Sequence, residues 1–274
     1  MSEASGLRYR AVVESLWSLR GPVENERAPR ERGVRYREGD ARGIAPRLDV
    51  YVPARRASPR SVLLVHGGGF VFGSRDMKPM RLVGSRLSDA GVTVASIDYR
   101  LIGRGGRLDE ALSDTRSALA FWRAGCAARD LDPDGVTIVG FSAGGTLSML
   151  VAGEHDAGVR NVVSCFGLYE LDHLTGPLAT VMPRLLFRTK DRERWSARSP
   201  REAPPPRVPT LLLHGTADGL VPVAQAHRLA DHRRKHGLPT HLSIYEGAPH
   251  GFFNQPGAHA ERGVKEILEH VLER

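Results

Sequence analysis

The stretch VTIVGFSAGGTLSMLVA, residues 136–152, predicts a buried β-strand, a sharp turn and then a helix. The turn has the pattern G-x-S-x-G, with Ser142 at its centre. Small residues on either side let the hydroxyl project, and the next backbone N–H and the positive end of the helix dipole face the same point. This pattern favours a nucleophilic serine. The alternatives are an idle serine in a glycine-rich turn and a phosphate-binding loop, although no G-x-x-x-x-G-K-[ST] pattern accompanies it.

A second glycine-rich segment, HGGGF over residues 66–70, follows the apolar run SVLLV directly. Three successive glycines lose much conformational entropy on folding. This loss is expected where backbone N–H groups must come close to a ligand, because glycine has no side chain to block the approach. Such donors can hold the negative oxygen that forms when an ester carbonyl is attacked. The alternative is a flexible glycine turn, and the serine turn downstream favours the oxyanion interpretation.

Chain order suggests the partners of Ser142, because the acid and then the histidine follow the serine in this arrangement. Four acidic residues lie between residue 200 and His250, namely Glu202, Asp218, Asp231 and Glu246. Asp218 comes just after the apolar run TLLLH, where the carboxyl edge of a parallel sheet would lie. His250 lies in EGAPHGFF, between the last expected strand and the last expected helix. We therefore favour Asp218 and His250, with Glu246 as the weaker candidate acid; His214 reads as a packed strand-end residue.

Short apolar runs alternate with helical patterns along the rest of the chain. This alternation predicts an α/β domain with a parallel sheet covered on both sides. The expected strands are Gly33–Arg37, Leu48–Val52, Ser61–His66, Val92–Asp98, Val136–Gly140, Asn161–Phe166, Thr210–His214 and His241–Tyr245. The expected helices are Arg75–Ala90, Asp109–Arg129, Ala143–Ala152, Pro222–His236 and Ala258–Glu273.

Two segments depart from the alternation. Residues 1–30 read as a polar, partly helical N-terminal segment. Residues 168–206 run from LYELDHLTG to the proline cluster APPPR, and we interpret them as a lid-like insertion within a single domain over residues 1–274. Apolar side chains there either cover a substrate pocket or merely pack the lid. The candidate substrate-binding residues are Phe70, Leu186, Phe187 and Leu220.

HGGGF, IDYRL, DPDGVTIVGFSAGG, TLLLHGTADGLVP and GAPHGFF together resemble the esterases of the α/β-hydrolase fold, over residues 46–272. The hormone-sensitive-lipase-type and bacterial feruloyl-esterase-like groups with an H-G-G-G motif are the most similar. The resemblance implies a mostly parallel, eight-stranded twisted sheet flanked by helices. It also implies Ser142 as nucleophile, His250 as base and Asp218 as its orienting acid, with N–H donors from Gly68, Gly69 and Ala143, and Gly67 as a further candidate donor. One departure is Phe141, where many hormone-sensitive-lipase-type members carry an aspartate.

Composition limits the partners and the compartment. The 274 residues carry a formal net charge of +8, but acids are interleaved among the basic residues and no nucleic-acid-binding motif accompanies them. Cys126 and Cys165 lack the spacing of a disulfide framework or a metal site. The N-terminus has scattered charges rather than a signal peptide, and no apolar run is long enough for a membrane helix. We expect a soluble, cytoplasmic protein that binds neither nucleic acid nor membrane; whether it forms a homo-oligomer is left open.

The expected reaction is cleavage of small to medium carboxylic esters through an acyl-enzyme on Ser142, with no metal or organic cofactor. An arylformamidase-like amidase would use the same residues and stays open as an alternative. A non-catalytic small-molecule-binding protein on the hydrolase scaffold is an alternative of another class. Such proteins often lack the serine or the histidine, whereas Ser142, Asp218 and His250 are all present here.

Overall fold

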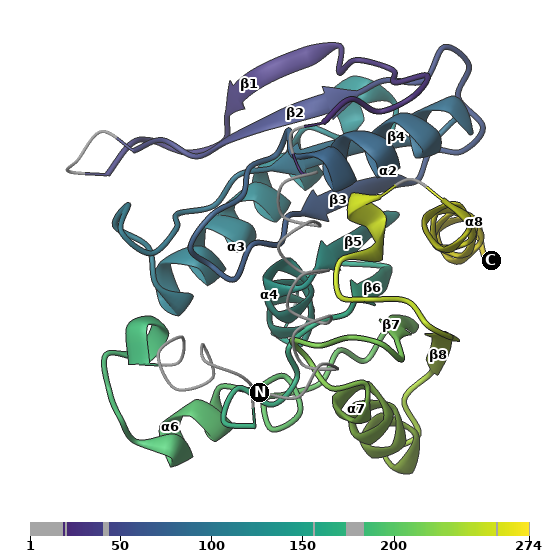
Figure 1. The fold of residues 1–274 in the computed structure, drawn as a ribbon. Helices are drawn as coiled ribbons and strands as arrows, with labels where there is room; N and C mark the ends of the chain where they lie inside the picture. Colours follow the sequence, from purple (N-terminus) through teal and green to yellow (C-terminus); the bar gives the residue numbers. More distant parts are fainter. Residues whose placement is uncertain are drawn as a thin grey trace.

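A computed structural model describes residue 19 and residues 21–40, 44–155, 157–173, 184–255 and 257–273. Eight strands form one sheet in the order β1-β2-β4-β3-β5-β6-β7-β8. Their bounds are β1 Glu31–Arg35, β2 Arg47–Tyr51, β3 Ser61–Val65, β4 Thr93–Ile97, β5 Val136–Phe141, β6 Asn161–Cys165, β7 Thr210–Gly215 and β8 Thr240–Tyr245. Figure 1 shows the sheet running from β1 and β2 at the top to β7 and β8 at the lower right.

The central strands are parallel and completely buried. Every residue of β3, β4, β5, β6 and β7 is buried, as expected for strands covered on both faces. The two N-terminal strands pair antiparallel, β1 with β2 and β2 with β4. The expected mostly parallel, eight-stranded α/β sheet is therefore confirmed. Because β3, β5 and β7 run in one direction, their carboxyl ends bring residues 66, 142 and 218 to the same edge of the sheet.

Helices cover both faces of the sheet. One core lies against α2 (Lys78–Asp89) and α8 (Ala258–Leu272) and contains the inward side chains Val62, Val94 and Leu213. The other core lies against α3 (Leu108–Ala124), α4 (Ala143–Ala152) and α7 (Ala224–Lys235) and contains Leu63, Ile138 and Leu212. Neighbouring strand residues thus alternate between the two cores, which is why these strands read as continuous apolar runs.

Some element boundaries differ from the predicted ones. The first strand ends two residues earlier than predicted, because it is an edge strand with only exposed or half-buried residues and a register shift after Glu31. Helix α2 begins at Lys78 and not at Arg75, whose backbone N–H donates to the Asp98 carboxylate. Helix α3 ends before Gly125, and a separate 3₁₀ turn follows at Ala127–Arg129.

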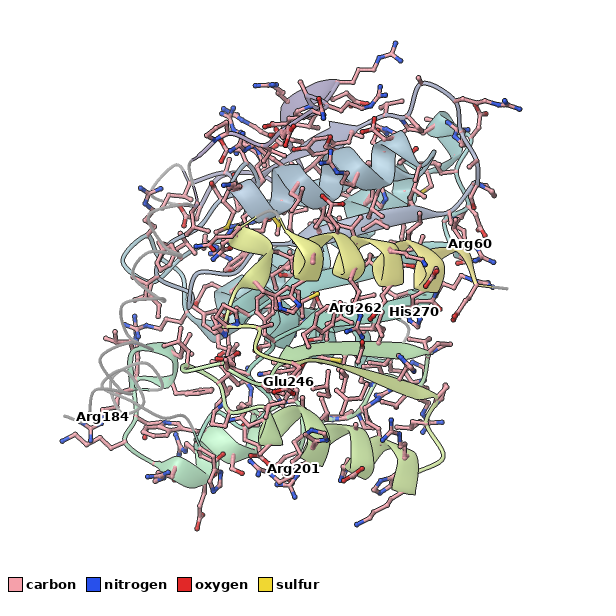
Figure 2. All side chains as sticks on the ribbon, turned by 45° about the vertical axis from the view of Figure 1, so that its right-hand side comes forward. Arg60, Arg184, Arg201, Glu246, Arg262 and His270 are labelled. Carbon is pink, nitrogen blue, oxygen red and sulfur yellow. The ribbon has the colours of Figure 1, made fainter. Side chains whose placement is uncertain are left out.

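The two unusual segments are only partly described. Residues 1–18 and 20 of the predicted N-terminal helical segment lie outside the described residues, as do residues 174–183 of the insertion. The insertion contains α6 (Arg192–Ala197). Asp191 caps its N-terminus, and the Asp191 side chain accepts a hydrogen bond from the N–H of Glu193. Figure 2 shows Arg184 at the lower left of the molecule and Arg201 at its bottom centre, near the two ends of the second described part of the insertion. Within the described part of the chain, no helix has both the length and the apolarity that a membrane span requires.

Candidate active site

Ser142 stands at a strained turn between β5 and α4. Its φ of 52° and ψ of −117° are unusual for a residue with a side chain, and they form the sharp turn before the helix that begins at Ala143. The flanking glycines are required by close packing. A Cβ on Gly140 would lie 2.1 Å from the Gly144 carbonyl oxygen, and a Cβ on Gly144 would lie 2.1 Å from the Val65 carbonyl oxygen. The predicted G-x-S-x-G turn is therefore formed as the residue sizes require.

The Ser142 hydroxyl is hydrogen-bonded to an imidazole that is itself held by a carboxylate. Ser142 Oγ lies 2.9 Å from His250 Nε2, and His250 Nδ1 lies 2.7 Å from Asp218 Oδ2. Because the carboxylate can only accept, Nδ1–H donates to it, which leaves Nε2 to accept the hydroxyl proton. The three side chains predicted from chain order come together, and such a chain can move a proton from the serine to the imidazole.

The Asp218 carboxylate is fully enclosed and held by four N–H groups. Oδ1 accepts from the backbone N–H groups of Leu220 at 2.9 Å and Val221 at 2.8 Å. Oδ2 accepts from His250 and also lies 3.2 Å from His214 Nε2. Burial alone would raise the pKa of Asp218, but the charge of His250 and the hydrogen bonds from both imidazoles outweigh it and lower that pKa. The carboxylate is thus stabilised in its ionised form.

The other candidate acid, Glu246, does not take this position. It is exposed in the loop after β8 (Figure 2), whereas the side chain of Asp218 is 0% exposed against the His250 ring. The His250 loop is closed by Gly251, whose φ is 70°, and the ring packs edge-on against Phe166 with centroids 5.1 Å apart. Packing of this kind limits rotation of the imidazole.

The HGGGF loop lies directly beside Ser142. A Cβ on Gly67 would lie 3.2 Å from Ser142 Cβ, so the glycine is required for this close approach. The loop turns sharply, with φ values of 108° at Gly68 and 60° at Gly69. Within the described ranges, the N–H groups of Gly68, Gly69 and Ala143 donate to no protein acceptor. Unused donors beside the hydroxyl are what an oxyanion site needs.

His66 shapes this loop. Its Nδ1 lies 2.7 Å from the Gly67 carbonyl oxygen, and its ring is stacked on Tyr99 with centroids 4.2 Å apart. Burial lowers the pKa of His66, and Tyr99 Oη donates to the His66 carbonyl at 3.1 Å. These contacts give the ring a structural role in holding the loop.

The candidate substrate-binding residues lie in different surroundings. Phe70 is 1% exposed and packs in the core, with a φ of 63°. Leu186 is also buried, while Phe187 is half-buried and packs against a small apolar cluster of Leu168, Leu171 and Val221. Leu220 joins that cluster, next to Asp218. Among the four, only Phe187 and Leu220 therefore belong to the apolar group beside Asp218.

Sequence reasoning missed one residue of the site, His214. It was interpreted as a packed strand-end residue, and it is indeed completely buried, but its Nε2 also lies 3.2 Å from Asp218 Oδ2. The signal that could have found it is the short spacing in H-G-T-A-D, which folds the histidine back onto the aspartate across a turn.

Comparison with known proteins finds a matching family and related esterases. The BD-FAE family model matches residues 48–232, more than half of the chain. Esterase LipC of Mycobacterium tuberculosis is 31% identical over 228 residues, which cover 73% of this chain and 55% of that protein. The probable isoprenylcysteine alpha-carbonyl methylesterase ICMEL1 of Oryza sativa subsp. japonica is 26% identical over 255 residues, which cover 82% of this chain and 59% of that protein. The chain therefore spans little more than half the length of these curated relatives.

A solved structure shares the fold over most of the chain. It is the thermophilic esterase Est2 of Thermogutta terrifontis with propionate bound, at a TM-score of 0.70 and 25% identity, covering 88% of this chain and 94% of that one. This likeness, with the sheet order described above, confirms the α/β-hydrolase fold that the sequence motifs resemble.

Proposed function

The chain belongs to the BD-FAE family, and from this premise we propose that it is a serine hydrolase that cleaves carboxylic esters of small to medium acyl or alcohol groups. The observation that carries the proposal is the continuous hydrogen-bonded chain from Ser142 Oγ through His250 to Asp218, with lengths of 2.9 Å and 2.7 Å. The relatives named esterases and the propionate bound in the Est2 structure support the substrate class.

The reaction proceeds in two acyl transfers. His250 Nε2 takes the hydroxyl proton as Ser142 Oγ forms a bond to the ester carbonyl carbon, and the resulting oxyanion accepts from the N–H groups of Gly68, Gly69 and Ala143. His250 then gives its proton to the leaving alcohol as the C–O bond breaks. A water molecule attacks the acyl-enzyme by the same route in reverse, which releases the acid and restores Ser142.

Asp218 serves this cycle without taking a proton. Its lowered pKa keeps the carboxylate ionised, so it stabilises the imidazolium that forms on His250 and fixes the tautomer that can accept from Ser142. The described parts of the insertion, residues 168–173 and 184–206, act as a lid of the substrate pocket, and the apolar side chains Phe187 and Leu220 contact the substrate. The two buried free thiols, Cys126 and Cys165, suit a reducing compartment such as the cytoplasm.

The test uses two serines of one turn–helix unit. Ser142→Ala should lower kcat for p-nitrophenyl acetate and butyrate by about 10⁴-fold or more and abolish labelling by an alkyl phosphonate, since no other residue of the turn GFSAG carries a side-chain hydroxyl. The matched control is Ser148→Ala, because Ser148 lies on the same helix and its buried Oγ has no hydrogen-bond partner among the described residues. Ester turnover that survives Ser142→Ala would overturn the proposal, as would phosphonate attached to a different residue.

A further inference from the structure

A second imidazole, that of His214, contacts the Asp218 carboxylate of the proposed triad. His214 is the penultimate residue of β7 and is completely buried. Its Nε2 lies 3.0 Å from the Val221 carbonyl oxygen and 3.2 Å from Asp218 Oδ2. Its Nδ1 is buried and has no hydrogen-bond partner in the part of the chain that the structure describes. Because both neighbours of Nε2 are acceptors, the ring proton lies on Nε2 and is shared between them.

We propose that His214 is a positioning residue for the Asp218 carboxylate, and that it sets how strongly that carboxylate attracts the proton of His250. The proposal rests on the proposed function of the triad. It goes beyond that function because His214 touches neither the substrate nor Ser142, and acts only through Asp218.

The first step of the argument is geometric. Val221 donates its N–H to Asp218 Oδ1 at 2.8 Å and accepts from His214 at 3.0 Å through its carbonyl oxygen. The three residues therefore form a closed ring of contacts that ties the loop carrying Asp218 to strand β7. With two donors on each oxygen, the carboxylate has no freedom to rotate away from His250.

The second step is electrostatic. Oδ2 is shared between two imidazole N–H groups, so His214 draws on the same negative charge that stabilises protonated His250. Removing this donor leaves more of the charge for His250 and favours its protonated form. Tyr169 is the further titratable group on which the Asp218 charge acts, and that charge contributes to raising the pKa of Tyr169. Loss of the His214 imidazole is thus expected to have two consequences. The Asp218 carboxylate is held by one donor fewer, and His250 gives up its proton less readily.

The variants separate these consequences from general damage. His214→Phe keeps an aromatic ring but removes the donor, and His214→Gln can place an amide N–H near the position of Nε2. The side chain of asparagine in His214→Asn is shorter and has no donor at the position of Nε2, so this variant serves as a second one without a donor to Asp218 if the phenylalanine variant does not fold. The matched control is His270→Phe, which also removes a buried imidazole that faces a backbone carbonyl, here Pro209 O at 3.4 Å. Figure 2 shows His270 near the C-terminal end of α8.

The measurement is the pH profile of kcat/KM for p-nitrophenyl butyrate, with active sites counted by phosphonate titration so that misfolded protein does not contribute. For His214→Phe and His214→Asn we expect kcat to fall about tenfold or more at nearly constant KM, as for outer partners of other catalytic groups. We also expect the acidic limb of the profile to move to higher pH. His214→Gln should restore both properties, and His270→Phe should retain the wild-type profile.

A readout without catalysis keeps this proposal separate from the proposed function. The downfield proton NMR resonance of His250 Nδ1–H reports the bond to Asp218, and it should shift in His214→Phe and His214→Asn but not in His270→Phe. If the wild type hydrolyses no ester while this resonance still responds to position 214, the proposed function fails and the positioning role stands. An unchanged acidic limb and resonance in a folded donor-free variant would refute the positioning role, and so would a glutamine variant as impaired as the phenylalanine one.

Discussion

Replacing Asp218 by asparagine tests the hydrogen-bonded chain from Ser142 to Asp218, because Asp218 carries the negative charge and sets the tautomer of His250. The carboxylate accepts on Oδ1 from the backbone N–H groups of Leu220 and Val221, and these donors cannot change. An asparagine must therefore keep its oxygen on that side and turn its NH₂ group toward His250. Two donors then face each other, because His250 Nδ1 carries the proton in the wild type.

The tautomer of His250 must change to relieve this conflict. The proton moves to Nε2, 2.9 Å from Ser142 Oγ, and the imidazole can no longer accept the hydroxyl proton. The corresponding change in a Ser-His-Asp protease lowers kcat by about 10⁴-fold, and we expect a loss of the same order here. At 1.36 kcal/mol for each factor of ten, this is about 5 kcal/mol of transition-state stabilisation.

The assay is steady-state hydrolysis of p-nitrophenyl butyrate at neutral pH, with circular dichroism to show that the fold is kept. Glu246→Gln is the matched control, since Glu246 is the alternative acid in the same region and is exposed. It should retain nearly full activity. An Asp218→Asn enzyme with kcat within tenfold of the wild type would show that Asp218 does not orient His250, and a large loss in Glu246→Gln would assign the acid role to Glu246.

The same substitution also changes how stability depends on pH. Burial alone would raise the pKa of Asp218. The charge of His250 and the hydrogen bonds from the two imidazoles lower the pKa by a larger amount, so the pKa in the folded state lies below the unfolded value of about 3.9. A depressed carboxyl pKa stabilises the fold above the unfolded pKa, and this contribution is lost as pH falls toward the folded pKa. Urea unfolding should therefore show wild type and Asp218→Asn differing most near neutral pH and converging below about pH 4.

Three further substitutions test the loop, the turn and a buried ion pair. Gly68→Ala should lower kcat about 10²-fold without unfolding the protein, because its Cβ would lie 2.0 Å from the Phe72 carbonyl oxygen and displace the oxyanion donors. Steady-state kinetics measures the loss of kcat, and circular dichroism shows whether the fold is kept. Gly140→Ala should cost about 3 kcal/mol of unfolding free energy, because its Cβ would lie 2.1 Å from the Gly144 carbonyl oxygen, and urea unfolding measures this. Glu170→Ala should cost about 2 kcal/mol in the same measurement, since it removes a buried carboxylate that pairs with two partly exposed arginines, Arg201 and Arg228.

Each of these has a matched control. Gly103→Ala also puts a side chain at positive φ, 85°, but in open space, so kcat should be unchanged. Gly257→Ala has open space and an extended φ of 169°, and should cost less than about 1 kcal/mol. Glu154→Gln weakens an exposed pair with Arg116 and should also cost less than about 1 kcal/mol. If a control variant lost as much activity or stability as the variant it is matched to, the steric or ionic explanation of that variant would be wrong.

The elements of the fold could be predicted because their local signals are strong. Strands β3, β5 and β7 are continuous apolar runs, and their predicted bounds agree with the observed ones to within one residue. The edge strand β1 begins and ends two residues earlier than predicted. Its half-exposed side chains and Gly33, at a φ of 65°, leave little hydrophobic pattern to mark its bounds. The predicted helix from Arg75 was wrong at its start, since a contact with Asp98 on another segment holds that residue outside the helix.

The turn at Ser142, the glycine-rich loop at residues 66–70 and the short set of candidate acids could be predicted from the residues alone, because each depends on residue size or on order along the chain. Which acid meets His250 depends on the folded arrangement of the strands. Ser142 and His250 are 108 positions apart and Asp218 and His250 are 32 apart, and they meet because parallel strands end at one sheet edge. The contact of His214 with Asp218 was likewise decided by the fold, since a buried histidine shows its hydrogen-bond partner only when the loop beside it is in place.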